Sequence, residues 1–157
     1  MDLAEMEKRL RALEDIEEIK KLQVHYLNCL ITCDWDELED CFAEDGATDF
    51  LESGISRGKA ALARDFRERI SESHIGKEGL FTVHPIVNVD GDKATGTWLF
   101  YYLTCHPREF PDFPDPKDVP DWMQGIYDME YVRENGKWKI SLLKWRARLK
   151  SVKAAEK

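Results

Sequence analysis

Three side chains in the sequence are suited to acid–base chemistry on an organic molecule, namely Tyr26, His84 and Tyr102. An imidazole can take up or release a proton near neutral pH. A phenol can donate a hydrogen bond to an oxygen atom that gains negative charge during a reaction. The combination favours proton transfer as the candidate chemistry. The structural alternative is that His84 bonds to backbone near a sheet edge and that both tyrosines are core residues whose hydroxyls have partners.

Strand periodicity places two of these side chains on defined faces. His84 follows Leu80 by four residues in a strand-like stretch, so the two share a face, because side chains alternate along a strand. Tyr102 follows Trp98 and Phe100 at every second position in the next strand-like stretch. If Leu80 faces a pocket, His84 faces it too.

A metal site on the first helical stretch is disfavoured by spacing. His25, Cys29 and Cys33 recur every four residues, and a His/Cys pair at that spacing can bind zinc. However, His25 and Cys33 would lie ~12 Å apart along a helix and could not share one ion. The spacing therefore predicts no metal here, and the family resemblance described below implies no organic cofactor. We expect these cysteines, with Cys41 and Cys105, to be reduced and mostly buried.

Composition limits the class of protein. The chain has 157 residues, of which 43% are hydrophobic, which suits one globular domain. A net charge of -8 disfavours a nucleic-acid binder, which needs a cationic face. No apolar run approaches the roughly 20 residues that span a bilayer, and the N-terminal stretch is too acidic for a signal peptide. We expect a cytoplasmic protein with neither nucleic acid nor membrane as a partner.

The first half of the sequence has helical periodicity. Apolar residues at helical spacing over residues 3–33 predict one or two amphipathic helices, and a capping pattern at Asp15 suggests that a helix restarts near Ile16. A second helix is predicted over 35–43 and a third over 57–70, with a short strand between them.

The second half changes to strand periodicity. Four stretches rich in β-branched and aromatic residues predict strands, and X-Gly turn dipeptides at 90–92 and 134–137 predict hairpins. The stretches are 80–89, 93–105, 124–133 and 137–150. Helices followed by a largely antiparallel sheet make an α+β fold.

A proline-rich segment interrupts the predicted sheet. Residues 106–121 hold five of the six prolines, so they cannot pair continuously in a sheet. We expect a loop insertion that acts as a lid over a pocket or as an arm packed on a neighbouring subunit.

Three blocks of the sequence resemble the SnoaL-like branch of the nuclear transport factor two-like superfamily: DIEEIKKLQVHYLNCLITCDWDELEDCF, HPIVNVDGDKATGTWLFYYL and YDMEYVRENGKWKI. The resemblance implies a cone-shaped α+β barrel, in which a strongly curved, mostly antiparallel sheet wraps around N-terminal helices and encloses an apolar pocket. It implies one domain over 1–157, with 1–14 as a helical extension, and assembly as a homodimer or homotrimer.

The resemblance also implies a catalytic pair that this sequence lacks. Lyases of the group pair an Asp, four residues before the Trp of a DW step, with a His on the strand before the GD hairpin. Counting from Trp35 puts Ile31 at the Asp position, and Leu80 falls at the His position. Both are apolar, which indicates changed or lost chemistry. A shift of three residues would make Asp34 the acid, but Asp34 is better explained as a helix N-cap.

By the same resemblance, Tyr26 points into the pocket, and Tyr102 stands where the bile acid 7-alpha-dehydratase branch has a catalytic-site Asp. His84 is then the candidate relocated base. The expected apolar, substrate-binding wall of the pocket consists of Ile31, Phe50, Leu80, Trp98, Phe100 and Trp145.

We therefore expect a cofactor-independent lyase or isomerase that acts on a hydrophobic, oxygenated aromatic or polycyclic compound, with Tyr26, His84 and Tyr102 in acid–base roles. Two alternatives remain open. The chain could be a non-catalytic carrier that binds such a compound, or a structural oligomerisation domain whose own side chains fill the cavity.

Overall fold

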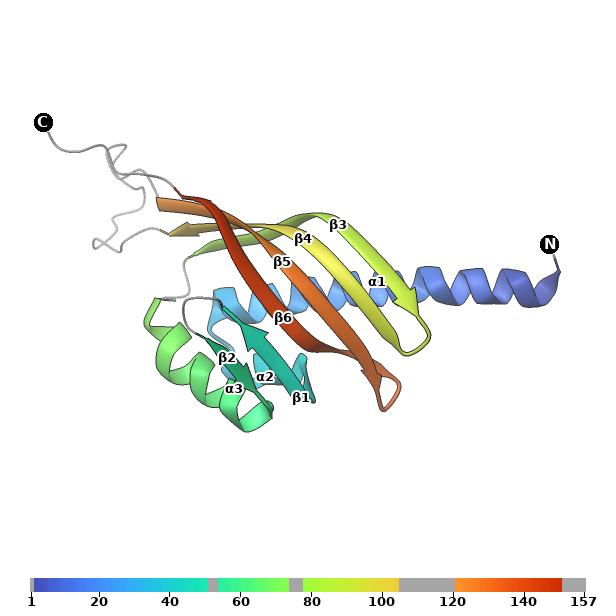
Figure 1. Cartoon of the computed structure of the whole chain (residues 1–157), viewed down its shortest axis with the longest axis horizontal. Coiled ribbons are helices and arrows are strands. Elements are labelled where there is room, and N and C mark those ends of the chain that lie inside the picture. The colour runs from blue at the N-terminus through green and yellow to red at the C-terminus, as the bar shows by residue number, and fades with distance from the viewer. Residues whose placement is uncertain (1, 51–53, 74–77, 105–120, 151–157) are drawn as a thin grey trace, which may run out of the picture.

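The computed structural model describes residues 2–50, 54–73, 78–104 and 121–150. The α-helices in these residues are α1 (Leu3–Thr32), α2 (Trp35–Asp40) and α3 (Lys59–Asp65). Helix α3 continues into a π-helical turn, η1 (Phe66–Ile70), and a short 3-10 turn, η2 (Ser71–Ser73). The strands are β1 (Phe42–Asp49), β2 (Ile55–Arg57), β3 (Gly79–Asp90), β4 (Lys93–Thr104), β5 (Asp121–Glu134) and β6 (Lys137–Lys150). The predicted α+β layout is confirmed (Figure 1).

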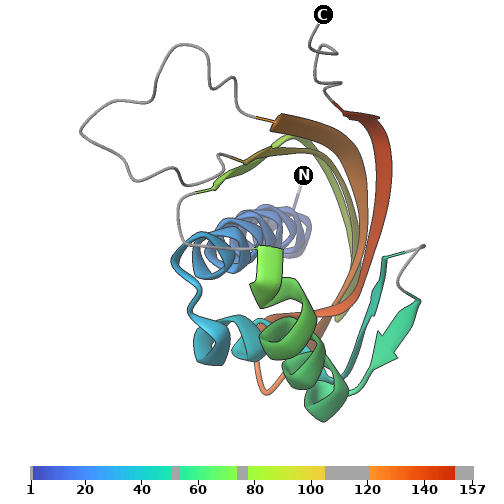
Figure 2. The ribbon, with the colours of Figure 1, turned by 90° about the vertical axis from the view of Figure 1, so that its left-hand side faces the viewer.

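The strands form one six-stranded sheet in the order β2-β1-β6-β5-β4-β3. Each neighbouring pair is antiparallel except β1 and β6, which are parallel. Figure 2 shows this sheet curving around α1, with α2 and α3 below the helix. The strongly curved, mostly antiparallel sheet that the sequence predicts is therefore confirmed, and its open curl leaves a concave face for the helices to cover.

Helix α1 is continuous from Leu3 to Thr32, so the predicted restart near Ile16 is wrong. Asp15, which was expected to cap a new helix, contacts the sheet instead. Its carboxylate pairs with Arg133 and accepts a hydrogen bond from Trp138 Nε1 at 3.1 Å. A tertiary contact replaces the local cap, and the backbone stays helical through this position.

The N-terminal part of α1 extends past the sheet (Figure 1). Its apolar side chains are exposed there, with Leu3 at 68%, Leu10 at 57% and Leu13 at 61%. From Ile19 onward the helix buries one face, because this part lies under the concave face of the sheet. The second half of α1 is thus the half that builds the core.

The core fills the space between the helices and the concave face. Its largest fully buried side chains come from α1, α2, α3, η1 and the strands β1, β5 and β6: Ile19, Tyr26, Leu38, Phe42, Leu62, Phe66, Met129, Tyr131, Ile140 and Leu143. Aromatic rings are prominent among them, which places large apolar area beside phenolic oxygens.

Strand β3 contains a bulge at the predicted base. The register with β4 shifts between Val83 and Ile86, so that His84 and Pro85 together oppose Trp98. His84 has φ 52°, a left-handed conformation that is uncommon for a residue other than glycine. Strand alternation therefore holds from Leu80 to Val83 and stops at His84.

Of the predicted insertion, residues 106–120 lie outside the described residues, and Asp121 begins β5.

Among the residues that the structure describes, no helix has the length and apolarity to span a bilayer.

Candidate active site

Two tyrosines from different elements meet at the centre of the core. Tyr26 on α1 and Tyr127 on β5 pack edge to face, with their ring centroids 6.5 Å apart. Tyr26 is 1% exposed and Tyr127 is 4% exposed. The edge of Tyr26 also packs against the rings of Phe42 and Phe66, at 5.8 and 6.5 Å between centroids.

Burial keeps both phenols neutral. It raises the pKa of Tyr26 well above its usual value, and the neighbouring Tyr127 raises this pKa further. Burial likewise raises the pKa of Tyr127, an effect that the neighbouring Tyr26 hydroxyl offsets in part. A neutral phenol in a dry environment donates hydrogen bonds and cannot act as a base.

Tyr102 completes what we call the phenol cluster (Tyr26, Tyr102 and Tyr127). It is partly buried, packs against the core, and contributes to the raised pKa of Tyr127. Its cross-strand neighbour on β3 is Leu80. Both tyrosines that the sequence selected therefore lie at the core together with Tyr127, Tyr26 within it and Tyr102 packed against it.

An aromatic wall borders the phenol cluster. Phe100 lies 4.5 Å from Tyr127 and 5.0 Å from Trp145, and Trp145 lies 5.5 Å from Tyr127, all between ring centroids. A glycine makes this possible, because a Cβ at Gly125 would overlap the Trp145 ring and the Arg146 carbonyl oxygen. The indole thus lies across β5 beside the phenols.

The remaining predicted wall residues occupy the same side of the sheet. Leu80 and Trp98 are buried, whereas Ile31 and Phe50 are partly buried and pack against the core. The indole N–H of Trp98 donates to the Tyr131 hydroxyl at 3.0 Å, which fixes Trp98 in the interior.

His84 is placed differently from the tyrosines. It is exposed, and the bulge rather than strand parity sets its direction. Bulges re-aim side chains and occur often beside active sites, and a positive φ at a residue other than glycine marks a constrained position. The catalytic role of His84 stays a prediction.

A buried amide was not anticipated from the sequence. Gln23 on α1 is fully buried, and its Oε1 accepts a hydrogen bond from the Tyr131 hydroxyl at 3.0 Å. Its Nε2 has no hydrogen-bond partner among the described residues. Such a group is costly to bury unless a water or ligand oxygen accepts from it. Gln23 therefore offers a donor for a polar ligand atom.

Sequence reasoning also missed Tyr127, although a signal was present. Alternation over β5 puts Gly125, Tyr127, Met129 and Tyr131 on the buried face. Asp128, on the other face, is half-exposed and pairs with Arg146, whose Nε donates to its carboxylate at 2.8 Å. The ion pair with Arg146 therefore explains Asp128 on the outer face of β5, whereas the neighbouring Tyr127 faces the core.

A hollow of about 280 Å³ lies near the β3–β4 hairpin and contains none of the predicted site residues. Polar side chains form much of its lining, including Asn88, Asp90, Thr95, Glu130 and Ser141. The predicted apolar pocket stays a prediction.

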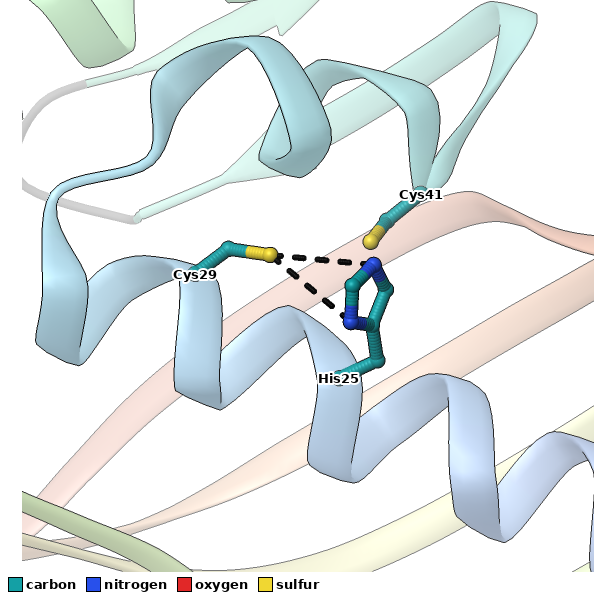
Figure 3. Close-up of side chains that lie close together, drawn as sticks. All are labelled: His25, Cys29 and Cys41. Atoms are coloured by element: carbon teal, nitrogen blue, oxygen red, sulfur yellow. Dashed lines mark hydrogen bonds between the residues drawn. The ribbon is translucent and has the colours of Figure 1, made fainter.

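Possible metal ligands gather at the junction of α1 and α2. His25, Cys29 and Cys41 bring their ligand atoms within 4.8 Å of one another (Figure 3). Cys33, the third member of the sequence-based trio, is not part of this group, and Cys41 takes its place. Burial raises the pKa of the Cys29 thiol and raises that of Cys41 to about 12, so both are neutral thiols without an ion.

A family model for the SnoaL-like domain matches residues 11–144. No curated protein matches the chain.

Solved structures share the fold at low sequence identity. The hexachlorocyclohexane dehydrochlorinase LinA-type3 from Novosphingobium barchaimii is 17% identical, with 94% of this chain and 96% of that chain covered and a TM-score of 0.77. An NTF2-like protein with a cystatin-like fold from Novosphingobium aromaticivorans is 23% identical, with 92% and 88% covered and a TM-score of 0.75. A candidate scytalone dehydratase from the same species is 16% identical, with 92% and 91% covered and a TM-score of 0.74.

Proposed function

Because the chain belongs to the SnoaL-like domain family, we propose that it is a cofactor-independent lyase or isomerase for a hydrophobic, oxygenated small molecule. Two structural neighbours, one a dehydrochlorinase and one a candidate dehydratase, point to elimination chemistry on this fold. Fold similarity at this level of identity does not carry a mechanism, so the proposal rests on the phenol cluster.

The observation that carries the proposal is a buried pair of packed phenols beside an aromatic wall. Tyr26 and Tyr127 are neutral donors held at the centre of the core, and Phe100 and Trp145 provide apolar surface next to them. A few polar groups converging in apolar surroundings are typical of small-molecule sites. Such donors stabilise an oxygen atom on which negative charge develops.

In this proposal the phenols act as hydrogen-bond donors and His84 acts as the base. Tyr102 and Tyr26 donate hydrogen bonds to a carbonyl or leaving-group oxygen of the substrate. His84 removes a proton from the neighbouring carbon, and the electron pair of that C–H bond forms the new double bond. In an elimination, the leaving oxygen departs with the proton of the half-buried Tyr102, and the proton that His84 took from carbon returns through solvent to the Tyr102 phenolate, which restores both groups. In an isomerisation, His84 returns the proton to a different carbon.

The first experiment identifies a substrate. Purified protein is screened by thermal shift against steroids, bile acids, aromatic diols and quinones, and each stabilising compound is analysed by mass spectrometry and chromatography after incubation. A change of mass or isomer supports an enzyme. A stabilising compound that is returned unchanged supports the carrier alternative, in which the apolar pair Ile31 and Leu80 marks lost catalysis.

Variants then test the roles. His84→Ala and Tyr102→Phe should each lower turnover of the converted compound by on the order of a hundredfold. Tyr101→Phe is the matched control, because Tyr101 stacks on Phe81, on the opposite face of β4 from Tyr102, and its hydroxyl accepts from Gln124. Full activity in both His84→Ala and Tyr102→Phe would remove the assignment.

Assembly as a homodimer or homotrimer stays a prediction that sizing by light scattering can test.

A further inference from the structure

Two thiols and an imidazole meet on the side of α1 that faces α2. His25 and Cys29 lie on successive turns of α1, and Cys41 is the C-cap of α2. Cys29 Sγ is 3.9 Å from His25 Nδ1 and 3.8 Å from His25 Nε2. Figure 3 shows Cys41 pointing at the same imidazole from above.

A tight reversal of the chain produces this meeting. Helix α1 ends at Cys33, whose φ of 56° turns the backbone, and the Asp34 N–H donates to the Cys29 carbonyl at 2.9 Å. Asp34 then caps α2 by accepting from the Glu37 N–H at 3.3 Å. One short helix later, Cys41 lies beside Cys29. Backbone bonds therefore hold the three side chains together without an ion.

The spacing suits a tetrahedral ion. Four ligands at zinc distances of ~2.0–2.3 Å lie roughly 3.5–3.8 Å from one another. The separation between Cys29 and His25 already has this value, and all three ligand atoms lie within 4.8 Å. Closing the site needs side-chain movements of about 1 Å, which rotamer adjustment can provide.

A carboxylate can reach the fourth position by a change of rotamer. Glu37 Oε2 lies 3.5 Å from His25 Nε2, outside the group of three ligand atoms that gather within 4.8 Å. The His25 and Glu37 side chains are 50% and 61% exposed, which gives an ion a path from solvent, whereas both cysteines are buried. Thiolate and imidazole ligands favour zinc over magnesium or calcium.

We propose that His25, Cys29 and Cys41 bind one Zn²⁺ ion per chain, with Glu37 as the fourth ligand. Binding displaces the two thiol protons, and the ion ties the end of α1 to the end of α2. It thereby fixes Cys41 and the adjacent Phe42, which packs on Tyr26. This site reverses the expectation of no metal, which considered Cys33 and not Cys41.

Cobalt reports the site directly. Full-length protein, stripped of metal and kept reduced with a phosphine, is titrated with Co²⁺ and followed by absorption. We expect a thiolate-to-cobalt charge-transfer band and strong visible bands of tetrahedral cobalt that saturate at one ion per chain and vanish on adding Zn²⁺. Zn²⁺ should raise the melting temperature by about 5 °C at saturating concentration.

Variants separate this site from its neighbours. Cys29→Ser and Cys41→Ser should lose the charge-transfer band and the zinc-dependent melting shift, and Glu37→Gln should weaken binding about 10-fold. Cys33→Ser is the matched control and should keep both signals. His25→Asn, at a half-exposed position, should weaken binding at least 10-fold and serves if a buried cysteine variant does not fold.

The proposal is overturned if the wild-type protein shows no thiolate band, or if Cys33→Ser removes the band while Cys41→Ser keeps it. An equal zinc-dependent melting shift in wild type, Cys29→Ser and Cys41→Ser would also contradict it. None of these readouts uses a substrate, so they are independent of the proposed lyase or isomerase activity.

Discussion

His25 and Tyr26 are neighbours on α1, yet they belong to clusters that differ in solvent access and in chemistry. Tyr26 is buried beneath the sheet with Tyr127, and burial keeps its phenol neutral. His25 faces α2, is half exposed, and lies beside Cys29 and Cys41. The comparison shows how one helix can supply a buried phenol on one side and, on the other, a half-exposed imidazole beside two buried thiols, the group proposed to bind zinc.

The largest effect on stability is expected from Gly125→Ala. This change would displace the aromatic wall beside the phenol cluster and leave the α1–α2 junction in place. The new Cβ would overlap the Trp145 ring and the Arg146 carbonyl, and backbone cannot move aside cheaply. We expect the free energy of unfolding in urea to fall by about 2–3 kcal/mol. Cobalt binding at His25 should persist in the folded variant, because the metal ligands come from the α1–α2 junction.

Gly79→Ala is the control for this change, since the three atoms nearest to its Cβ would belong to the Leu103 side chain, at 3.2 Å or more. Gly79→Ala should lower the free energy of unfolding by less than about 1 kcal/mol. Equal losses in the two variants would show that the Trp145 contact has no special weight.

A smaller effect is expected at alkaline pH, where the phenol cluster should respond. Burial raises the pKa of Tyr127 above its unfolded value of about 10. Below pH 10 the neutral phenol therefore makes its full contribution to the stability of the folded protein. As pH rises further, the unfolded chain ionises while the folded phenol does not, and stability falls. Between pH 10 and 11, the free energy of unfolding in urea should therefore fall by about 1 kcal/mol less for Tyr127→Phe than for the wild type. Parallel losses in both proteins would contradict the buried, neutral phenol.

The smallest effect is expected on the outer face of the sheet. Asp128 and Arg146 form an ion pair whose side chains are 38% and 47% exposed. Asp128→Asn should change the free energy of unfolding by less than about 0.5 kcal/mol and leave turnover unchanged. A large loss of turnover on the substrate found by screening would place Asp128 in the site and remove the contrast between the two faces of β5.

Local signals in the sequence account for most of the sheet. Richness in β-branched and aromatic residues predicted the four long strands, and the turn dipeptides located both hairpins. Asn135 and Gly136 adopt φ of 51° and 78°, and Gly91 adopts 60°, as tight X-Gly turns require. These elements could be predicted because neighbouring residues alone determine them.

Features set by distant contacts could not be predicted in this way. Asp15 resembles a helix cap until Arg133 and Trp138 approach it from the sheet. Cys41 joins His25 only because the chain reverses at Cys33. Such contacts leave no periodic pattern in the sequence.

The candidate site was anticipated only in part for the same reason. Tyr26 and Tyr102 were selected by resemblance, but their common partner Tyr127 lies on a later strand. Strand parity failed at His84 because a bulge adds a residue opposite Trp98. Bulges depend on pairing between strands, which single-strand alternation does not reveal.

The most direct test of the account is the turnover of Tyr26→Phe, compared with Tyr101→Phe, on the compound that the screen shows to be converted. Both variants remove one phenolic oxygen, but only Tyr26 belongs to the buried cluster. The account predicts a loss of on the order of a hundredfold in kcat for Tyr26→Phe and wild-type turnover for Tyr101→Phe. Wild-type turnover in a folded Tyr26→Phe would contradict it, because the buried phenol would then have no part in the chemistry.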